Sequence, residues 1–185
     1  MSMHSSHFLT RYGTGVVYAT VQGVVKVELP DLSRSETVHC VEQRPEFEPS
    51  EITTCVAGML QRYLHGEQVD FGDIPVLLDG LTPFRRTILA AIRELHYGEI
   101  STYGRVAREC GSPSAARAAG GALASNPIPI IIPCHRIVAS DGRLTGFSAP
   151  GGERAKMVLL KMEGVEFNGL LVDANQMVIH RAACR

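Results

Sequence analysis

The chain has 185 residues, of which 45% are hydrophobic and 20% are charged, and its formal net charge is −1. This composition is typical of an ordered globular protein, which excludes a disordered chain, and no apolar run is long enough to span a bilayer. The first residues lack the apolar core of a signal peptide, so we expect no membrane partner and a cytoplasmic location, or a nuclear one in a eukaryote.

The first half of the chain is predicted to contain a strand pair and a helix. Residues 15–29 are rich in valine and are interrupted at Gly23, a pattern typical of a β-hairpin. Residues 50–65 place apolar side chains at helical spacing. A connector rich in Gly, Pro and Asp follows at 70–83, with a short strand predicted at 76–78.

The second half has the spacing of helices separated by short turns. A Thr-Pro pair opens the first helix, because proline is favoured in a first helical turn. The predicted elements, in chain order, are helices at 83–96, 101–110, 115–124 with Ser114 as its cap, and 151–163, followed from 165 by a strand and a tail. The second and third of these helices, with a turn at 111–113, form a helix-turn-helix pattern.

We expect two domains, residues 1–81 and residues 82–185, and they differ in net charge. The net charge is −6 up to residue 82 and +5 from residue 83 onward. A basic half is typical of a protein that binds nucleic acid. We therefore expect an α/β N-terminal supporting domain with its linker, and a mainly helical C-terminal domain that carries the function.

The residues most indicative of function are Cys134 and His135, at the end of an apolar run that begins at residue 128. Pro129 and Pro133 disfavour helical backbone, which predicts that the thiol lies on an extended, rigid segment. A thiol beside an imidazole is a nucleophile with a potential base. The five cysteines are an odd number without a CxxC pair, so we expect a free thiol in a reducing compartment. A buried structural cysteine is the alternative.

Four ordered motifs surround this thiol between about Pro83 and Gly164. They are Arg117-Ala-Ala-Gly-Gly-Ala-Leu123, Asn126-Pro127, Pro133-Cys134-His135-Arg136 and Leu159-Leu160-Lys-Met-Glu163-Gly164. This set resembles the O6-alkylguanine-DNA alkyltransferase family, the methylated-DNA–protein-cysteine methyltransferases.

The resemblance implies a ribonuclease H-like N-terminal domain and a winged-helix-like helix-turn-helix in the C-terminal domain. It implies direct-reversal DNA repair by a monomer that needs no cofactor. The partner is double-stranded DNA containing O6-alkylguanine, whose nucleotide is flipped out before the alkyl group moves to Cys134, once per molecule. O4-alkylthymine in DNA is a second candidate substrate.

The resemblance also assigns catalytic roles. His135 takes the thiol proton through a water molecule, and Glu163 orients and charges the imidazole. Tyr103 matches the tyrosine that gives a hydrogen bond to the leaving guanine. The alternatives are a solvated helix end for Glu163 and a packed structural role for Tyr103.

The helix that follows residue 114 is the expected DNA reader. Its side chains are small except for Arg117, so the helix can approach the minor groove while the arginine fills the space of the flipped base. The residues expected to contact DNA are Thr102, Ser114, Ala115, Ala116, Arg117, Ala118, Gly120 and Gly121. The alternative is tight helix–helix packing with Arg117 in solvent.

The substrate pocket is expected to involve Asn126, Pro129, Ile137, Phe147 and Ser148. In the resemblance, Asn126 ties the recognition helix to the cysteine segment, Ser148 offers a backbone donor to O6, and the Ile137 carbonyl accepts from the exocyclic amine. Phe147 stands where many relatives have tyrosine, and Ala124 stands where some have an arginine. The alkyl groups accepted and the phosphate contacts are therefore expected to differ.

Three alternatives remain open. Some relatives bind zinc, and His4, His7, His39 and Cys40 are candidate ligands, but their spacing fits no standard zinc finger and we expect no metal site. A non-catalytic module that binds alkylated bases is a second alternative, against which Cys134 argues directly. A Cys-His hydrolase is the third, and multiple turnover without DNA would identify it.

Overall fold

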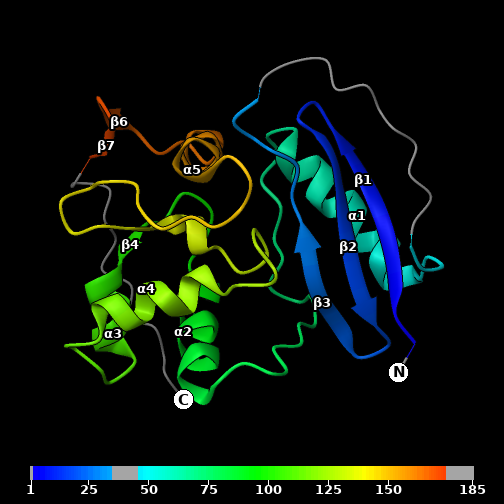
Figure 1. Ribbon diagram of the computed structural model, residues 1–185. Coiled ribbons are helices and arrows are strands. Elements are labelled where there is room, and N and C mark those ends of the chain that lie inside the picture. Colours follow the sequence, from blue (N-terminus) through cyan, green and yellow to red (C-terminus); the bar gives the residue numbers. More distant parts are fainter. Residues whose placement is uncertain (1, 35–45, 174–185) are drawn as a thin grey trace.

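The computed structural model describes residues 2–34 and 46–173. A three-stranded sheet with helix α1 on one face occupies one side of the molecule, and helices α2 to α5 occupy the other (Figure 1). Among the described residues, no helix combines the length and the apolar content needed to cross a membrane.

The sheet is an antiparallel meander of β1 (His4–Thr10), β2 (Gly13–Thr20) and β3 (Gly23–Glu28). Alternate residues of β2 are buried, as expected for a strand with one face on a core. The predicted hairpin at 15–29 is confirmed, but β1 was not predicted. Its buried positions include the consecutive residues Ser5 and Ser6, whose hydroxyls bond to Phe47 O and Thr53 Oγ1, so the strand lacks an apolar alternation.

Helix α1 (Glu51–Leu64) confirms the helix predicted at 50–65. Ser50 caps its N-terminus in a reciprocal capping box with Thr53, which satisfies two backbone donors. The connector then runs beside β3, where Val24 N donates to Pro75 O and Leu77 N donates to Val24 O, both at 2.8 Å. The strand predicted at 76–78 is reduced to this single bridge.

In the described part of the second half, α-helices alternate with turns and with a long segment that carries Cys134 between the last two helices. The helices are α2 (Pro83–Arg93), α3 (Tyr103–Glu109), α4 (Ala116–Ala124) and α5 (Gly152–Met162). Two-residue strands complete it, with β4 (Ser101–Thr102) parallel to β5 (Ile137–Val138) and β6 (Phe167–Asn168) antiparallel to β7 (Leu171–Val172). The pairing of β4 with β5 fixes the start of α3 beside the cysteine segment.

Three predicted helix boundaries are wrong. Helix α3 begins at Tyr103 rather than residue 101, because Ser101 and Thr102 pair with β5 as strand β4 and Thr102 caps the helix. Helix α2 ends at Arg93 rather than residue 96, because Leu95 leaves the helical pattern and its carbonyl accepts from Arg136 Nη1. Helix α4 has Ala115 at its N-cap position and no side-chain cap, so Ser114 does not cap it. The helix instead follows a turn in which Ala115 N donates to Ser112 O.

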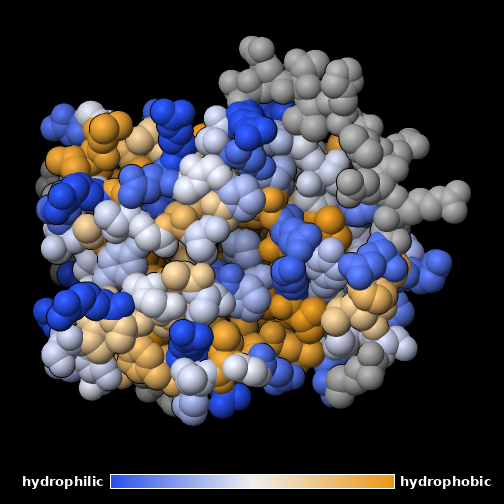
Figure 2. All heavy atoms as spheres, viewed as in Figure 1, coloured by the Kyte–Doolittle hydropathy of each residue, from blue (hydrophilic) through white to orange (hydrophobic). Residues whose placement is uncertain are grey.

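One hydrophobic core cluster continues from the sheet and α1 into α2, α4 and the apolar run before Cys134. Figure 2 shows hydrophobic residues gathered between the sheet side and the helical side of the molecule. A backbone hydrogen bond of 2.9 Å from Val27 N to Pro127 O joins the edge strand β3 to the segment that leads to Cys134. The first half of the chain therefore forms one wall of the region around the thiol.

Candidate active site

The segment that carries the thiol is more sharply folded than the sequence predicts. Ile130 has a φ of 73°, a left-handed backbone that β-branched residues rarely adopt. The chain then enters a 3-10 turn, η1 (Cys134–Arg136), rather than an extended segment. The extended, rigid presentation predicted from the two prolines is therefore wrong. The left-handed turn and the 3-10 turn orient Cys134 and His135 to different neighbours.

Cys134 is a buried free thiol held by Asn126. The Asn126 amide donates to Cys134 Sγ at 3.2 Å and to Ile132 O at 2.8 Å, and its oxygen accepts from Ile128 N at 3.0 Å. One side chain thus ties the end of α4 to the thiol segment, as the sequence predicted. The bond to sulfur also places a donor where a thiolate would form.

Burial raises the pKa of the Cys134 thiol, and the Asn126 hydrogen bond and the charge of Lys156 oppose that rise. The thiol is therefore protonated at neutral pH, and forming the nucleophile requires a base. Lys156 itself is fully buried, and this burial lowers its pKa to about 8. Its ammonium group donates to the carbonyls of Ile137 at 2.5 Å and Thr145 at 2.7 Å.

A cavity of about 420 Å³ opens beside Cys134. Its walls come from both halves of the chain, and they comprise Lys26 to Leu29 of the β3 edge, Asn126, Pro127, Pro129, Cys134 and Phe147 to Pro150. Four of the five predicted pocket residues therefore meet here. Ile137 does not line the cavity, because it is fully buried and its carbonyl accepts from Lys156.

His135 is fully buried and contacts Glu163, the residue that ends α5. Its Nε2 lies 3.0 Å from Glu163 Oε1, whereas its Nδ1 is buried without a partner in the described part of the chain. Burial lowers the pKa of His135, although the Glu163 carboxylate opposes that effect. The imidazole is therefore neutral at neutral pH, and it has one nitrogen available as a base.

Glu163 lies in an arrangement of donors that the sequence predicted only in part. Arg136 forms a buried ion pair with it, with Nη2 at 2.7 Å from Oε1 and Nε at 2.9 Å from Oε2. Gly98 N donates to Oε2 at 3.2 Å, and the Tyr63 hydroxyl donates to Oε1 at 2.6 Å. Burial alone would raise the pKa of Glu163, but His135 and Arg136 hold it well below its ordinary value. The carboxylate is ionised, so Glu163 is not a solvated helix end.

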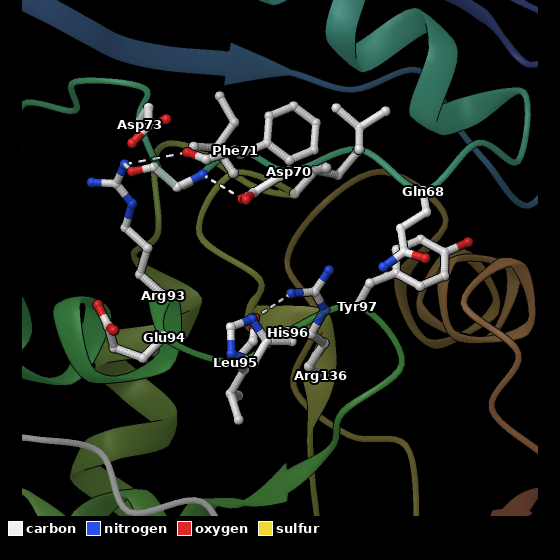
Figure 3. A pocket seen from close by; sticks show the side chains of 14 residues that line it. Gln68, Asp70, Phe71, Asp73, Arg93, Glu94, Leu95, His96, Tyr97 and Arg136 are labelled. Atoms are coloured by element: carbon white, nitrogen blue, oxygen red, sulfur yellow. Dashed lines mark hydrogen bonds between the residues drawn. The ribbon is translucent and has the colours of Figure 1, made fainter.

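Arg136, one partner of this ion pair, lines a second cavity of about 740 Å³ (Figure 3). This cavity separates the loop at 68–73 from the end of α2, and Arg93 reaches across to donate to Gly72 O at 2.9 Å. Arg136 points into the same cavity, where its guanidinium donates to Leu95 O at 2.6 Å. No residue predicted for the active site lines this second cavity.

Tyr103 begins α3 and faces the loop that follows residue 144. Its hydroxyl donates to Thr145 O at 2.6 Å, the carbonyl that also accepts from Lys156. Gly146 makes this approach possible, since a Cβ there would lie 2.8 Å from the Tyr103 oxygen, and its φ of 68° is left-handed. The phenol therefore lies at the rim of the thiol region with its proton held by a backbone carbonyl.

Helix α4 presents a smooth exposed face. Ala119, Ala122 and Leu123 are buried, whereas the exposed positions along the helix are Arg117, Ala118, Gly121 and Ala124. Ser114 is also exposed, and Thr102, Ala115, Ala116 and Gly120 are partly buried. Arg117 is thus a single long side chain on a surface of methyl groups and glycine, which contradicts the alternative that this face is packed.

Sequence reasoning missed Tyr63, Arg136 and Lys156 as neighbours of the relay. Arg136 was visible in the Pro-Cys-His-Arg motif, but nothing in the motif gives its partner. Of the proposed zinc ligands, His39 and Cys40 lie outside the described residues, and His4 Nδ1 lies 3.1 Å from Glu48 O. In the parts of the chain that are described, no three His, Cys, Asp or Glu side chains gather as metal ligands.

Helices α3 and α4, with the smooth outer face of α4, occur in the same half of the chain as a buried thiol and a neutral imidazole, a combination that we expect of a nucleic-acid-binding protein whose cysteine accepts a transferred group. Residues 83–165 match the family described as 6-O-methylguanine DNA methyltransferase, DNA binding domain. With a 37% identical relative, a methylated-DNA–protein-cysteine methyltransferase of Methanosarcina acetivorans, the alignment covers 78% of this chain and 81% of that protein. The chain therefore belongs to the methylated-DNA–protein-cysteine methyltransferase family.

Two further relatives agree with this assignment. The chain is 50% identical over 107 residues to the methylated-DNA–protein-cysteine methyltransferase of Haemophilus influenzae, and this alignment spans 58% of each protein. A crystal structure of Mycobacterium tuberculosis OGT in complex with DNA is similar with a TM-score of 0.68 at 30% identity, covering 86% of this chain and 92% of that one. The fold is therefore the mixed α/β and helical fold of this family.

Proposed function

We propose that this protein repairs DNA by transferring an alkyl group from O6-alkylguanine to Cys134. The observation that carries the proposal is the buried pair of Cys134 and neutral His135, beside a cavity large enough for a base. The thiol proton passes through a water molecule to His135 Nδ1, which has no partner among the residues that the structure describes. The sulfur then bonds to the alkyl carbon while the bond from that carbon to O6 breaks.

Guanine leaves as an anion whose charge must be met by a donor. Tyr103 would give that hydrogen bond once its proton leaves Thr145 O. The product is a thioether, which has no good leaving group, so Cys134 is consumed and each molecule reacts once. The reaction as written needs no cofactor.

The substrate must leave the base stack, because the O6 edge is covered inside a duplex. We assign the DNA surface to the exposed face of α4, whose small residues permit close approach to the minor groove. Arg117 would enter the gap left by the flipped nucleotide. The base would then occupy the cavity beside Asn126, Pro129, Phe147 and Ser148, and O4-alkylthymine is a second candidate for the same cavity.

The finer organisation of the protein belongs to this proposal. We infer a ribonuclease H-like N-terminal domain over residues 1–81 from the antiparallel meander and α1, and a winged-helix-like domain over 82–185 from the contact of α3 with α4. We propose that a monomer acts on alkylated duplex DNA. A location in the cytoplasm, or in the nucleus of a eukaryote, is part of the same proposal.

The competing function is binding of alkylated bases without chemistry, which Cys134 and its buried base do not support. The two functions are separated by incubating the protein with excess duplex that contains radiolabelled O6-methylguanine. We expect one equivalent of label on the wild type and none on Cys134→Ser, with Cys110→Ser as the matched control that keeps full transfer. Repeated turnover, or binding of the duplex without transfer, would contradict the proposal.

A further inference from the structure

Tyr63 lies in the last turn of α1, in the half of the chain that the sequence assigns to a supporting domain. Its side chain nevertheless ends at the His135–Glu163 pair. The residue is 1% exposed, and the rings of Phe71 and Tyr97 pack edge-on against it at centroid distances of 5.9 and 6.1 Å. The phenol is therefore held in one position.

Two hydrogen-bond distances show where the phenol proton lies. The Tyr63 hydroxyl donates to Glu163 Oε1 at 2.6 Å, and the same oxygen lies 3.2 Å from His135 Nε2. Because a phenol has one proton and gives it to the carboxylate, its oxygen faces His135 as an acceptor. Glu163 Oε1, 3.0 Å from the same nitrogen, is a second acceptor.

These two acceptors select one tautomer of His135. A lone pair on Nε2 would oppose the oxygens of both Tyr63 and Glu163, so Nε2 carries the hydrogen and Nδ1 keeps the lone pair. Nδ1 is also the nitrogen that is buried without a partner within residues 2–34 and 46–173. The nitrogen left free to accept a proton is therefore determined by groups on the other side of the ring.

We propose that Tyr63 is a positioning residue for alkyl transfer, which holds His135 in the tautomer whose Nδ1 can accept the thiol proton. The inference rests on the proposed function for its catalytic consequence. When the proton moves from Cys134 to Nδ1, the imidazolium keeps its Nε2 hydrogen between Glu163 and Tyr63. The first half of the chain thus contributes one hydrogen-bonding group to the chemistry.

The other charged groups near the ring oppose this imidazolium. Arg136, from the same 3-10 turn, and Lys156, from α5, both lower the pKa of His135, after the larger effect of burial. Glu163 is the carboxylate that offsets them. Tyr97 packs on Tyr63, but its hydroxyl donates to Met162 O at 2.6 Å and not to the relay. Stabilisation of the cation therefore depends on Glu163 and on the oxygen of Tyr63.

The test compares Tyr63→Phe with Tyr97→Phe, which removes a hydroxyl group from a second tyrosine of the same aromatic cluster. Two quantities are measured for each variant, the single-turnover rate on duplex with O6-methylguanine across pH, and the nitrogen chemical shifts of His135 in the free protein. For Tyr63→Phe we expect a roughly tenfold slower reaction at neutral pH, because one hydrogen bond in a charged network is lost. We also expect a higher pH for half-maximal rate and a mixture of imidazole tautomers. Tyr97→Phe should match the wild type in all three.

The inference would be overturned if Tyr63→Phe kept the wild-type rate and a single, unchanged tautomer of His135. It would also be overturned if the two variants lost reaction rate equally, because that result would indicate an effect on packing alone. Should Tyr63→Phe not fold, the wild-type spectrum decides, since a hydrogen on Nδ1 rather than Nε2 contradicts the assignment. The tautomer is measured without DNA. It therefore tests Tyr63 even if the wild type transfers no alkyl group, an outcome that would defeat only the proposed function.

Discussion

Replacing Glu163 by glutamine is expected to weaken the fold as well as the reaction. The carboxylate and Arg136 form an ion pair with side-chain exposures of 0% and 7%, and the carboxylate also accepts from Tyr63 and His135. A neutral amide leaves the buried guanidinium without its carboxylate partner, although the Leu95 carbonyl still accepts from it. Breaking a buried pair in this way costs about 3–5 kcal/mol. That is a large part of the roughly 5–15 kcal/mol that stabilises a typical domain.

Urea unfolding followed by circular dichroism measures this loss, and a double-mutant cycle identifies its cause. Arg136→Met alone should also be destabilising, whereas Glu163→Gln combined with Arg136→Met should recover much of the loss, because no unpaired charge remains. At the activity level, Glu163→Gln should raise the apparent pKa of the coupled Cys134–His135 pair, since an amide does not stabilise the imidazolium. A loss of stability below about 1 kcal/mol, or strictly additive single losses, would refute the reasoning.

Three further results are expected. Arg117→Ala should slow repair of duplex more than reaction with free O6-benzylguanine, which needs no flipping, and equal losses in the two rate measurements would remove Arg117 from that role. The free energy of unfolding should fall as the pH is lowered below about 6.5 and again below about 4.3. His135 and Glu163 have lower pKa values in the folded than in the unfolded protein, so unfolding takes up protons in these two ranges. Urea unfolding over this pH range measures the two losses, and His135→Gln should lack the first. The affinity for duplex should fall only gradually with salt, because each phosphate contact contributes about −0.9 to the slope of log affinity against log salt concentration and we expect few contacts. Sequence preference should be slight, and a steep slope or strong sequence selectivity would mean that another surface holds the DNA.

The elements that could be predicted from the sequence are those with local signals. The Thr-Pro pair predicted to open a helix does so at α2, where Thr82 caps the helix through its side chain, and Ser50 caps α1 in the same way. Strand β1 could not be predicted, because its buried serines are satisfied by partners more than forty residues away. Ser114 is a residue type typical of an N-cap, but the N-cap position of α4 is Ala115 and no side chain caps the helix.

The same distinction applies to the site. The adjacency of Cys134 and His135 is given by the sequence, and their relation to Glu163 followed from the family motifs. The contact of Tyr63 with Glu163 joins residues 100 positions apart. Lys156 is fully buried, but its position in the sequence does not distinguish it from an ordinary surface lysine of α5. The Tyr63 contact depends on how the two halves pack, and the Lys156 contacts depend on how α5 packs on residues 137–145, so no local pattern in the chain encodes either.

The central claim is that Cys134 is the alkyl acceptor. It is tested most directly by incubating the protein with duplex that contains O6-methylguanine and mapping the modified peptide by mass spectrometry. The account predicts one added methyl group, located on Cys134, while Cys40, Cys55, Cys110 and Cys184 stay unmodified. A methyl group on any of those four cysteines, or guanine restored in the duplex with Cys134 still unmodified, would contradict it.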